Sequence, residues 1–180
     1  MFTDSMYEIQ IPSGVQVRVS EDGSEVEVKG KLGSATKRIN VTLLSVKVSD
    51  QKLTIDVTKN KKLAKKAALA TKAMDTEMKS VIDGVEKGIE KHMKVLFAHF
   101  PITIEVKKDL VLIKNIFGEK RPREARIIGD TKVDVKGTEL FIKGVDPYDV
   151  GQTVANIYKR SFSRNKDSRV FQDGIYVVEE

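Results

Sequence analysis

An internal repeat sets the framework of this sequence. Residues 26–33 resemble residues 111–118, with a lysine and a glycine at matching positions. Residues 46–55 and 133–142 resemble each other in the same order, and the offset between the copies is 85 residues for the first pair and 87 for the second. A chance likeness of strand patterns would not be expected to share order, spacing and a glycine. We therefore interpret the chain as a tandem duplication of one small domain.

Alternating apolar residues predict the strands of each copy. Residues 15–19 read Val-Gln-Val-Arg-Val, Asp22-Gly23 supplies a hairpin turn, and the alternation resumes at Val26. Residues 39–43 show the same period through Ile39, Val41 and Leu43, which predicts a further strand there. Short strands joined by tight turns are typical of antiparallel sheets.

Each copy then enters a helical pattern. Asn60 is the expected N-cap of the first helix, and Asp146 that of the second, where Pro147 takes the first helical position. Gly151 is unfavourable inside a helix by about 1 kcal/mol, so we interpret it as a point of close packing on the sheet. The apolar stripes are Leu63, Ala67, Ala70, Met74, Met78 and Val81 in the first helix and Val150, Val154 and Ile157 in the second.

These elements predict an α+β fold, a small domain in tandem duplication, in which one helix packs on each antiparallel sheet. Residues 80–91 are interpreted as a short helix that connects the copies, and residues 92–100 as the first strand of the second copy. We therefore divide the chain into a first repeat at residues 1–80 and a second at residues 81–180, which carries a basic C-terminal tail.

Several classes of activity lack a basis in the sequence. There is no cysteine, which excludes disulfides, thiolate zinc sites and a cysteine nucleophile. His92 and His99 would stand about 23 Å apart along a strand, too far to share a metal. Motifs for phosphate cradles, zinc hydrolases and serine nucleophiles are absent. No apolar run reaches membrane-span length and residues 1–10 do not form a signal peptide. We expect no enzyme, cofactor, metal or small-molecule substrate.

The charge of the chain favours a polyanionic partner. It contains 32 Lys and Arg against 26 acidic residues, for a net charge of +6. Solvated charged faces on a basic protein are the alternative, so the kind of basic residue is more informative than the total. The first half contains only Arg18 and Arg38, whereas the second contains six arginines. Because the guanidinium fork suits phosphates and stacked bases, the second half is the predicted binding domain.

Two basic clusters stand out in that half. The first runs from a strand into a loop punctuated by Gly118 and Pro122, and the second begins at the end of the second helix. A linker without fixed structure is the alternative for the second cluster, but the apolar residues around Asp173-Gly174 favour a chain that packs back onto the domain. The basic residues are Lys114, Lys120, Arg121 and Arg123 in the first cluster and Lys159, Arg160, Arg164, Lys166 and Arg169 in the second.

Three motifs, together with the duplication, resemble a known family. They are residues 114–123, residues 142–147 with Val150-Gly151-Gln152, and residues 169–176, which read Arg-Val-Phe-Gln-Asp-Gly-Ile-Tyr. In these the chain is similar to the universal L-six family of large-subunit ribosomal proteins, over essentially its whole length. The ending resembles the archaeal and eukaryotic branch, because the Pro-Tyr-Lys-Gly-Lys-Gly type of ending of the bacterial branch is absent.

The resemblance implies a structural protein of the large ribosomal subunit in the cytoplasm. It implies binding to large-subunit ribosomal RNA near the stalk base and the sarcin–ricin loop, mainly through the second domain and tail. Carried onto this chain, the resemblance implies that the RNA-binding residues are Lys114, Lys120, Arg121, Arg123, Arg160, Arg164, Lys166 and Arg169. Neighbouring ribosomal proteins at the stalk base and translational GTPases nearby are the further partners it implies. The alternative from another class is a tandem protein-interaction module without affinity for RNA, which would bind its partner independently of salt.

Overall fold

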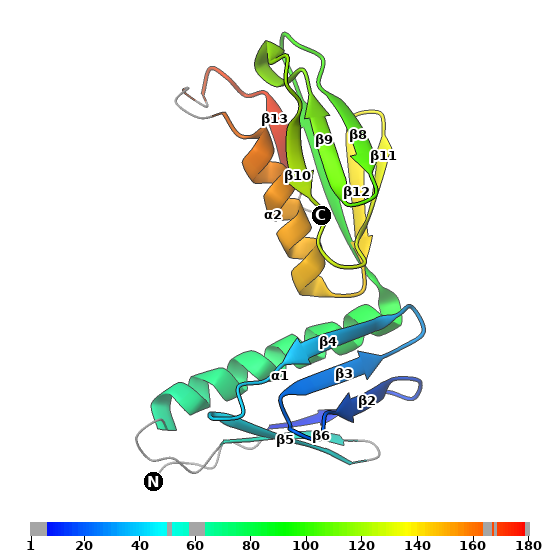
Figure 1. Cartoon of the computed structure of the whole chain (residues 1–180), viewed down its shortest axis with the longest axis vertical. Helices are drawn as coiled ribbons and strands as arrows, with labels where there is room; N and C mark the ends of the chain where they lie inside the picture. The colour runs from blue at the N-terminus through cyan, green and yellow to red at the C-terminus, as the bar shows by residue number, and fades with distance from the viewer. Residues whose placement is uncertain (1–6, 50–51, 58–63, 164–166, 168, 179–180) are drawn as a thin grey trace. The chain divides into compact units, whose positions relative to one another are not determined.

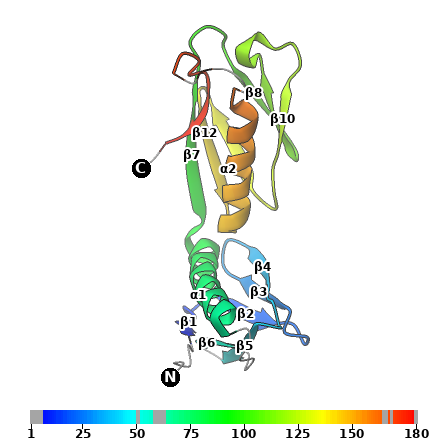
Figure 2. The ribbon, with the colours of Figure 1, turned by 90° about the vertical axis from the view of Figure 1, so that its left-hand side faces the viewer.

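The computed structural model describes residues 7–49, 52–57, 64–163, 167 and 169–178. The chain divides into two compact units, residues 1–88 and residues 89–180, referred to below as unit 1 and unit 2. Both units are mixtures of short antiparallel strands and one long helix (Figures 1 and 2). Neither α1 nor α2, the two helices described below, is long and apolar enough to cross a membrane.

The described residues of unit 1 form six strands followed by a helix. The strands form two antiparallel sheets, of order β2-β3-β4 and β1-β6-β5, and the helix contacts strands of both. The elements are β1 (Tyr7–Gln10), β2 (Gln16–Val19), β3 (Glu25–Lys29), β4 (Ser34–Arg38), β5 (Leu44–Ser49), β6 (Lys52–Val57) and α1 (Ala64–Lys87).

Unit 2 repeats this order and adds a strand. Its sheets have the orders β10-β9-β8 and β11-β12-β7-β13, and every pairing is antiparallel. The elements are β7 (Ile89–Leu96), β8 (Thr103–Lys107), β9 (Leu110–Lys114), the 3-10 turn η2 (Ile116–Gly118), β10 (Arg123–Arg126), β11 (Lys132–Lys136), β12 (Glu139–Gly144), α2 (Pro147–Ser161) and β13 (Gly174–Val177).

The two units share one topology, which confirms the predicted duplication of a small α+β domain. The sheet β1-β6-β5 corresponds to β7-β12-β11, and β2-β3-β4 corresponds to β8-β9-β10. The equivalent residues have equivalent environments, since Leu53 and Ile55 of β6 and Leu140 and Ile142 of β12 are all completely buried. Each unit contains two small sheets, whereas the sequence predicted one sheet. Strands β2, β3 and β4 pair only with one another, and so do β8, β9 and β10.

The core of unit 2 joins both of its sheets to α2. Val111 and Ile113 of β9, Met93 and Val95 of β7 and Ile157 of α2 belong to one buried cluster. Figure 2 shows α2 lying along the strands of this unit, so the helix covers the side on which these residues gather. Val, Ile and Leu provide most of the cluster, as expected of a chain with 6% aromatic residues and no tryptophan.

The start of α2 is as predicted from the sequence, with Asp146 as the N-cap. The Asp146 carboxylate accepts the Tyr148 backbone N–H at 2.8 Å, and Pro147 stands in the first turn. Of the predicted stripe, Val150 and Ile157 are buried and Val154 is partly buried. In α1 the residues Ala67, Met74, Met78 and Val81 are buried, whereas Asn60 and Leu63 lie outside the described residues.

Two local predictions are wrong. Residues 39–43 do not form a strand: β4 ends at Arg38, and the backbone N–H groups of Leu43 and Leu44 turn back to the Asn40 carbonyl. Gly151 is exposed and a Cβ there would meet nothing within 4 Å, so it does not pack on the sheet. The close contact occurs at Gly144, where a Cβ would lie 2.6 Å from Val150 Cγ2.

The boundary between the repeats also differs from the prediction. Residue 81 lies inside α1, which continues without a break to Lys87 instead of leading into a separate connecting helix. The helix ends at Gly88, whose φ of +77° is left-handed and whose N–H bonds to the Gly84 carbonyl at 2.9 Å. The compact units therefore divide after Gly88, and the first strand of unit 2 begins at Ile89 rather than at His92.

Candidate nucleic-acid interface

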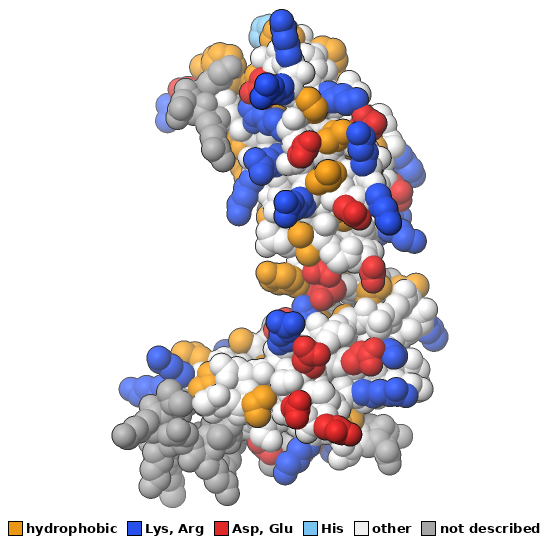
Figure 3. Space-filling view, viewed as in Figure 1, with side chains coloured by type: hydrophobic (Ala, Val, Ile, Leu, Met, Phe, Trp, Pro, Cys, Tyr) orange, Lys and Arg blue, Asp and Glu red, His pale blue; other side chains and the backbone are white. Residues whose placement is uncertain are grey.

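The structure locates six of the eight predicted binding residues. Lys114 ends β9, Lys120 and Arg121 lie in the loop before β10, and Arg123 begins β10. Arg160 lies in the last turn of α2, and Arg169 lies in the segment before β13. Arg164 and Lys166 lie outside the described residues. Lys and Arg side chains, in blue, lie across the visible face of unit 2 in Figure 3, with fewer acidic ones among them.

The loop that carries Lys120 and Arg121 has a tightly defined backbone. Asn115, Phe117 and Gly118 have φ values of 60°, 50° and 76°, so two residues with a Cβ take the left-handed conformation. Each such residue costs about 1–2 kcal/mol unless its surroundings hold it. The Asn115 amide donates to the Pro101 carbonyl at 3.2 Å, and Ile116 between the two strained residues is completely buried. The loop is therefore held in one shape.

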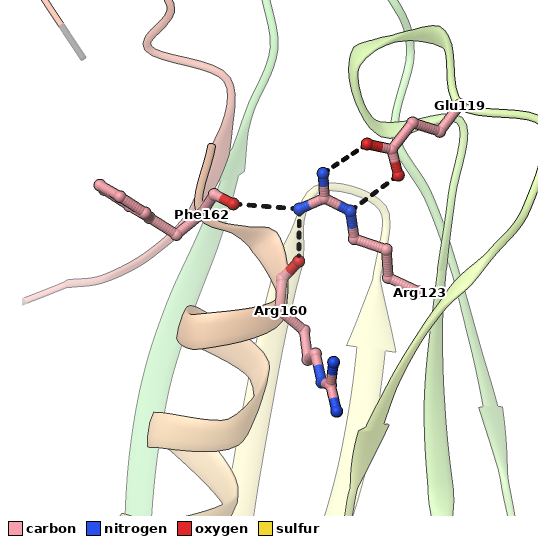
Figure 4. Close-up of polar contacts among 4 residues, drawn as sticks. All are labelled: Glu119, Arg123, Arg160 and Phe162. Atoms are coloured by element: carbon pink, nitrogen blue, oxygen red, sulfur yellow. Dashed lines mark hydrogen bonds and ion pairs between the residues drawn. The ribbon is translucent and has the colours of Figure 1, made fainter. Parts of the chain in front are cut away.

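Arg123 connects this loop to the end of α2 (Figure 4). Its Nε donates to Glu119 Oε2 at 2.8 Å, and Nη2 donates to Glu119 Oε1. Its Nη1 donates to the backbone carbonyls of Arg160 at 2.9 Å and Phe162 at 3.0 Å. The guanidinium also lies 5.6 Å from the centre of the Phe117 ring. One side chain thus holds both basic clusters together.

This bonding leaves little of the Arg123 guanidinium for another partner. Four of its five N–H groups are used by the contacts above, and its side chain is 24% exposed. The hydrogen bonds that Arg123 donates to Glu119 raise the pKa of Arg123 above its ordinary value, and burial partly opposes this shift. The sequence offered no signal for this arrangement, because two of the acceptors are backbone carbonyls.

Lys120 and Arg121 have the opposite environment. Both side chains are exposed, and within the described part of the chain neither forms a hydrogen bond or an ion pair. Lys114 is also exposed, but its Nζ lies 2.5 Å from Glu105 Oε2, and this contact lowers the pKa of the Glu105 carboxyl. The loop therefore presents two exposed cations, Lys120 and Arg121, whereas Lys114 at the end of the adjacent strand β9 is paired with Glu105.

The second cluster surrounds the end of α2. The Arg160 side chain extends away from the Arg123 contacts in Figure 4, while its carbonyl accepts from Nη1. Arg169 is exposed in a turn in which its N–H donates to Asp167 Oδ1 at 2.9 Å. The following β13 pairs with β7, which confirms that the chain packs back onto the domain.

Arg126 is an exposed cation that the sequence predictions omitted. It ends β10, and its carbonyl accepts from the Asn156 amide of α2 at 3.0 Å, so the strand end is fixed to the helix. The burial of Ala125 turns its neighbours Glu124 and Arg126 outward. The alternation Arg-Glu-Ala-Arg with alanine inward could have identified it.

The two histidines have different environments. His92 of β7 stacks on Phe141 with ring centres 4.8 Å apart, and its Nε2 lies 3.6 Å from Glu139 Oε2. His99 lies beyond the end of β7 and is exposed. Across the described residues, no group of three or more His, Cys, Asp or Glu side chains is placed to hold a metal ion.

The sequence is similar to known ribosomal proteins over nearly its whole length. It is 39% identical to the large ribosomal subunit protein uL6 of Methanocella arvoryzae, over 99% of this chain and 98% of the relative. It is 39% identical to uL6 of Methanobrevibacter smithii and 40% identical to uL6 of Methanosphaera stadtmanae, over 95% and 94% of this chain and 93% and 91% of those relatives. No family model matches the sequence.

These relatives place the chain among the ribosomal proteins, and the duplicated fold agrees with the duplication read from the sequence. More particularly, it belongs to the family of large ribosomal subunit protein uL6. The resemblance seen in the sequence motifs is thereby confirmed.

Proposed function

We propose that this chain is a structural constituent of the large ribosomal subunit and binds large-subunit ribosomal RNA mainly through unit 2. The observation that carries the proposal is the near full-length similarity to archaeal uL6 proteins. The exposed cations of unit 2 supply the binding groups. Its site would be near the stalk base and the sarcin–ricin loop, beside other ribosomal proteins and within reach of translational GTPases.

Binding would proceed without catalysis, through cations held in fixed positions. Lys120 and Arg121 lie on a loop whose backbone is held at Asn115 and Arg123, so little conformational freedom is lost when they meet phosphates. Arg160 at the end of α2 and Arg169 in the segment before β13 would add contacts. Folded RNA helices present phosphates and 2′-hydroxyls rather than readable base edges, which suits such a surface.

The salt dependence of binding tests the assignment of these cations. The full chain is bound to protein-free large-subunit RNA over a range of salt concentrations, together with a Lys120→Ala, Arg121→Ala double variant. The slope of log K against log salt is expected to flatten by about 1–2 units, at roughly 0.7–0.9 per lost phosphate contact. Lys47→Ala, in an exposed position of β5 in unit 1, serves as control and should leave the slope unchanged.

An unchanged slope in the double variant would contradict the binding role of the loop. Binding of the wild type to protein partners only, at a strength independent of salt, would favour a protein-interaction module instead. The same preparation can be examined for association with whole large subunits, which requires no assumption about individual residues.

A further inference from the structure

Exposed aromatic rings are concentrated at one end of unit 2. Six aromatic side chains are exposed among the residues that the structure describes, and five of them lie in three segments: 97–100, 158–162 and 171. Tyr148, at the start of α2, is the sixth. We refer to the five as the aromatic end. Its members are Phe97, Phe100, Tyr158, Phe162 and Phe171.

Specific contacts bring the three segments together. The Ala98 N–H donates to Asp173 Oδ1 at 2.9 Å, and Leu96 pairs with Gly174, which fixes the end of β7 beside the start of β13. The Tyr158 ring lies 6.1 Å from the Phe162 ring and 6.2 Å from the Tyr176 ring of β13. The aromatic end therefore lies where the end of β7, the end of α2 and the start of β13 come together.

The same region adjoins the basic loop. A Cβ on Gly118 would lie 3.4 Å from the Phe100 ring, so this ring packs on the turn that leads to Lys120 and Arg121. Arg123 then connects that turn to the Phe162 carbonyl. In Figure 3, hydrophobic side chains in orange lie between basic ones in blue at this end of unit 2.

The rings of the aromatic end are not part of the hydrophobic core of unit 2. Phe97, Phe100, Phe162 and Phe171 are each between 43% and 47% exposed, whereas the buried cluster of unit 2 consists of aliphatic residues and methionine. Partly exposed rings beside cations fit a partner that offers both flat apolar faces and negative charge. The nearby exposed cations include Lys159, Arg160 and Arg169, and the Asp167 carboxylate is engaged by the Arg169 N–H.

We propose that the aromatic end stacks on unpaired nucleotides of the bound RNA, while the adjacent cations neutralise the phosphates of the same strand. Stacking of bases on aromatic side chains requires no particular base, because every base has a flat face. This inference rests on the proposed function and deepens it. It assigns part of the binding to loops or bulges in the RNA rather than to helical RNA alone.

Substitutions that remove a ring but keep an apolar side chain test the proposal. Phe97→Leu and Phe171→Leu are compared with the wild type in binding of the full chain to protein-free large-subunit RNA across salt. Each is expected to weaken binding about tenfold, because one stacking contact is lost. The slope against salt should stay at the wild-type value, since no phosphate contact is removed. Tyr148→Leu, on the exposed ring outside the region, should bind as the wild type does.

Magnetic resonance provides a second measurement. The ring protons of Phe97 and Phe171 should shift upfield when a single-stranded RNA oligonucleotide is added to the full chain, and should not shift with a duplex of the same length. Circular dichroism of each variant confirms that the fold is retained.

Three outcomes would overturn the inference. Wild-type affinity in both leucine variants would show that the rings do not stack on RNA. Variants that bind free RNA normally but no longer associate with large subunits would show that the region faces a protein. Equal ring shifts with duplex and single strand would exclude unpaired nucleotides. If the wild type binds RNA and only the Lys120→Ala, Arg121→Ala variant is weakened, the proposed function stands and this inference alone fails.

Discussion

Arg123 Nη1 donates a hydrogen bond to the backbone carbonyl of Arg160 at 2.9 Å, across 37 positions of sequence. The bond connects the first residue of β10, where the first basic cluster ends, to the last turn of α2, where the second cluster begins. An arginine predicted to contact RNA thus holds other cations in position. Its direct contact with phosphate stays a prediction, with one N–H left for it.

Removal of the Arg123 side chain should weaken the fold of unit 2. Arg123→Ala leaves the carbonyls of Arg160 and Phe162 without this donor and removes the Arg123 contacts with Glu119. We expect the free energy of unfolding to fall by about 1–3 kcal/mol, measured by urea unfolding of the full chain monitored at unit 2 amides. Arg123→Lys should recover only part of the loss, because a single ammonium cannot span three partners.

The Arg123→Ala and Arg123→Lys variants together distinguish two possible roles of Arg123 in RNA binding. If it acts by positioning, Arg123→Lys should weaken binding although it retains the charge, and the slope of log K against log salt should stay the same. If instead it contacts a phosphate directly, Arg123→Lys should bind almost normally and Arg123→Ala should flatten the slope by roughly 0.7–0.9. Binding isotherms of the three proteins at four salt concentrations distinguish these results.

Gly144 and Gly151 offer a matched pair for testing the packing of α2. A Cβ at residue 144 would lie 2.6 Å from Val150 Cγ2, so Gly144→Ala should destabilise unit 2 by about 1–3 kcal/mol. At residue 151 there is nothing within 4 Å, so Gly151→Ala should stabilise it by about 0.5–1 kcal/mol through helix propensity. Chemical denaturation of both variants measures the difference, and equal effects would contradict the packing described for Gly144.

The Lys114–Glu105 pair should be visible in a pH titration. Lys114 donates to Glu105 and lowers the pKa of its carboxyl in the folded chain. The contribution of the pair to stability is therefore complete above the pKa of the unfolded chain and is lost as the pH falls through the folded value. Carbon-13 resonance of the Glu105 carboxyl should show a titration midpoint below that of the Lys114→Met variant. Coincident midpoints would mean that the pair does not form in solution.

Most of the fold was predictable because each repeat shows its strands and helix as local patterns of apolar, capping and turn residues. The strands around Val26, Leu53 and Leu140 follow from alternation, and the start of α2 follows from Asp146 and Pro147. The division of each unit into two sheets was not predictable. Alternation shows which face of a strand is buried, but it does not show which other strands pair with it. The packing prediction for Gly151 was wrong because the sequence of a helix does not show whether the space beside a glycine is filled by a neighbouring element or open to solvent.

The candidate site was predictable only in part. The position of Lys120 and Arg121 in an exposed loop follows from the glycine and proline around them. The role of Arg123 depends on carbonyls that any residue could provide, so no sequence pattern marks it. The aromatic end was not predictable from the sequence, because the segment that carries Phe97 and the one that carries Phe171 are far apart in the chain and are brought together only when β13 pairs with β7.

The most direct test of the proposed role is sedimentation of the native full-length chain in an extract. At moderate salt the chain should be found with large ribosomal subunits, and it should remain there when the two subunits are separated by lowering magnesium. High salt should release it, as expected for binding dominated by phosphate contacts. A chain that stays with the free proteins at the top of the gradient at every salt concentration would contradict the account.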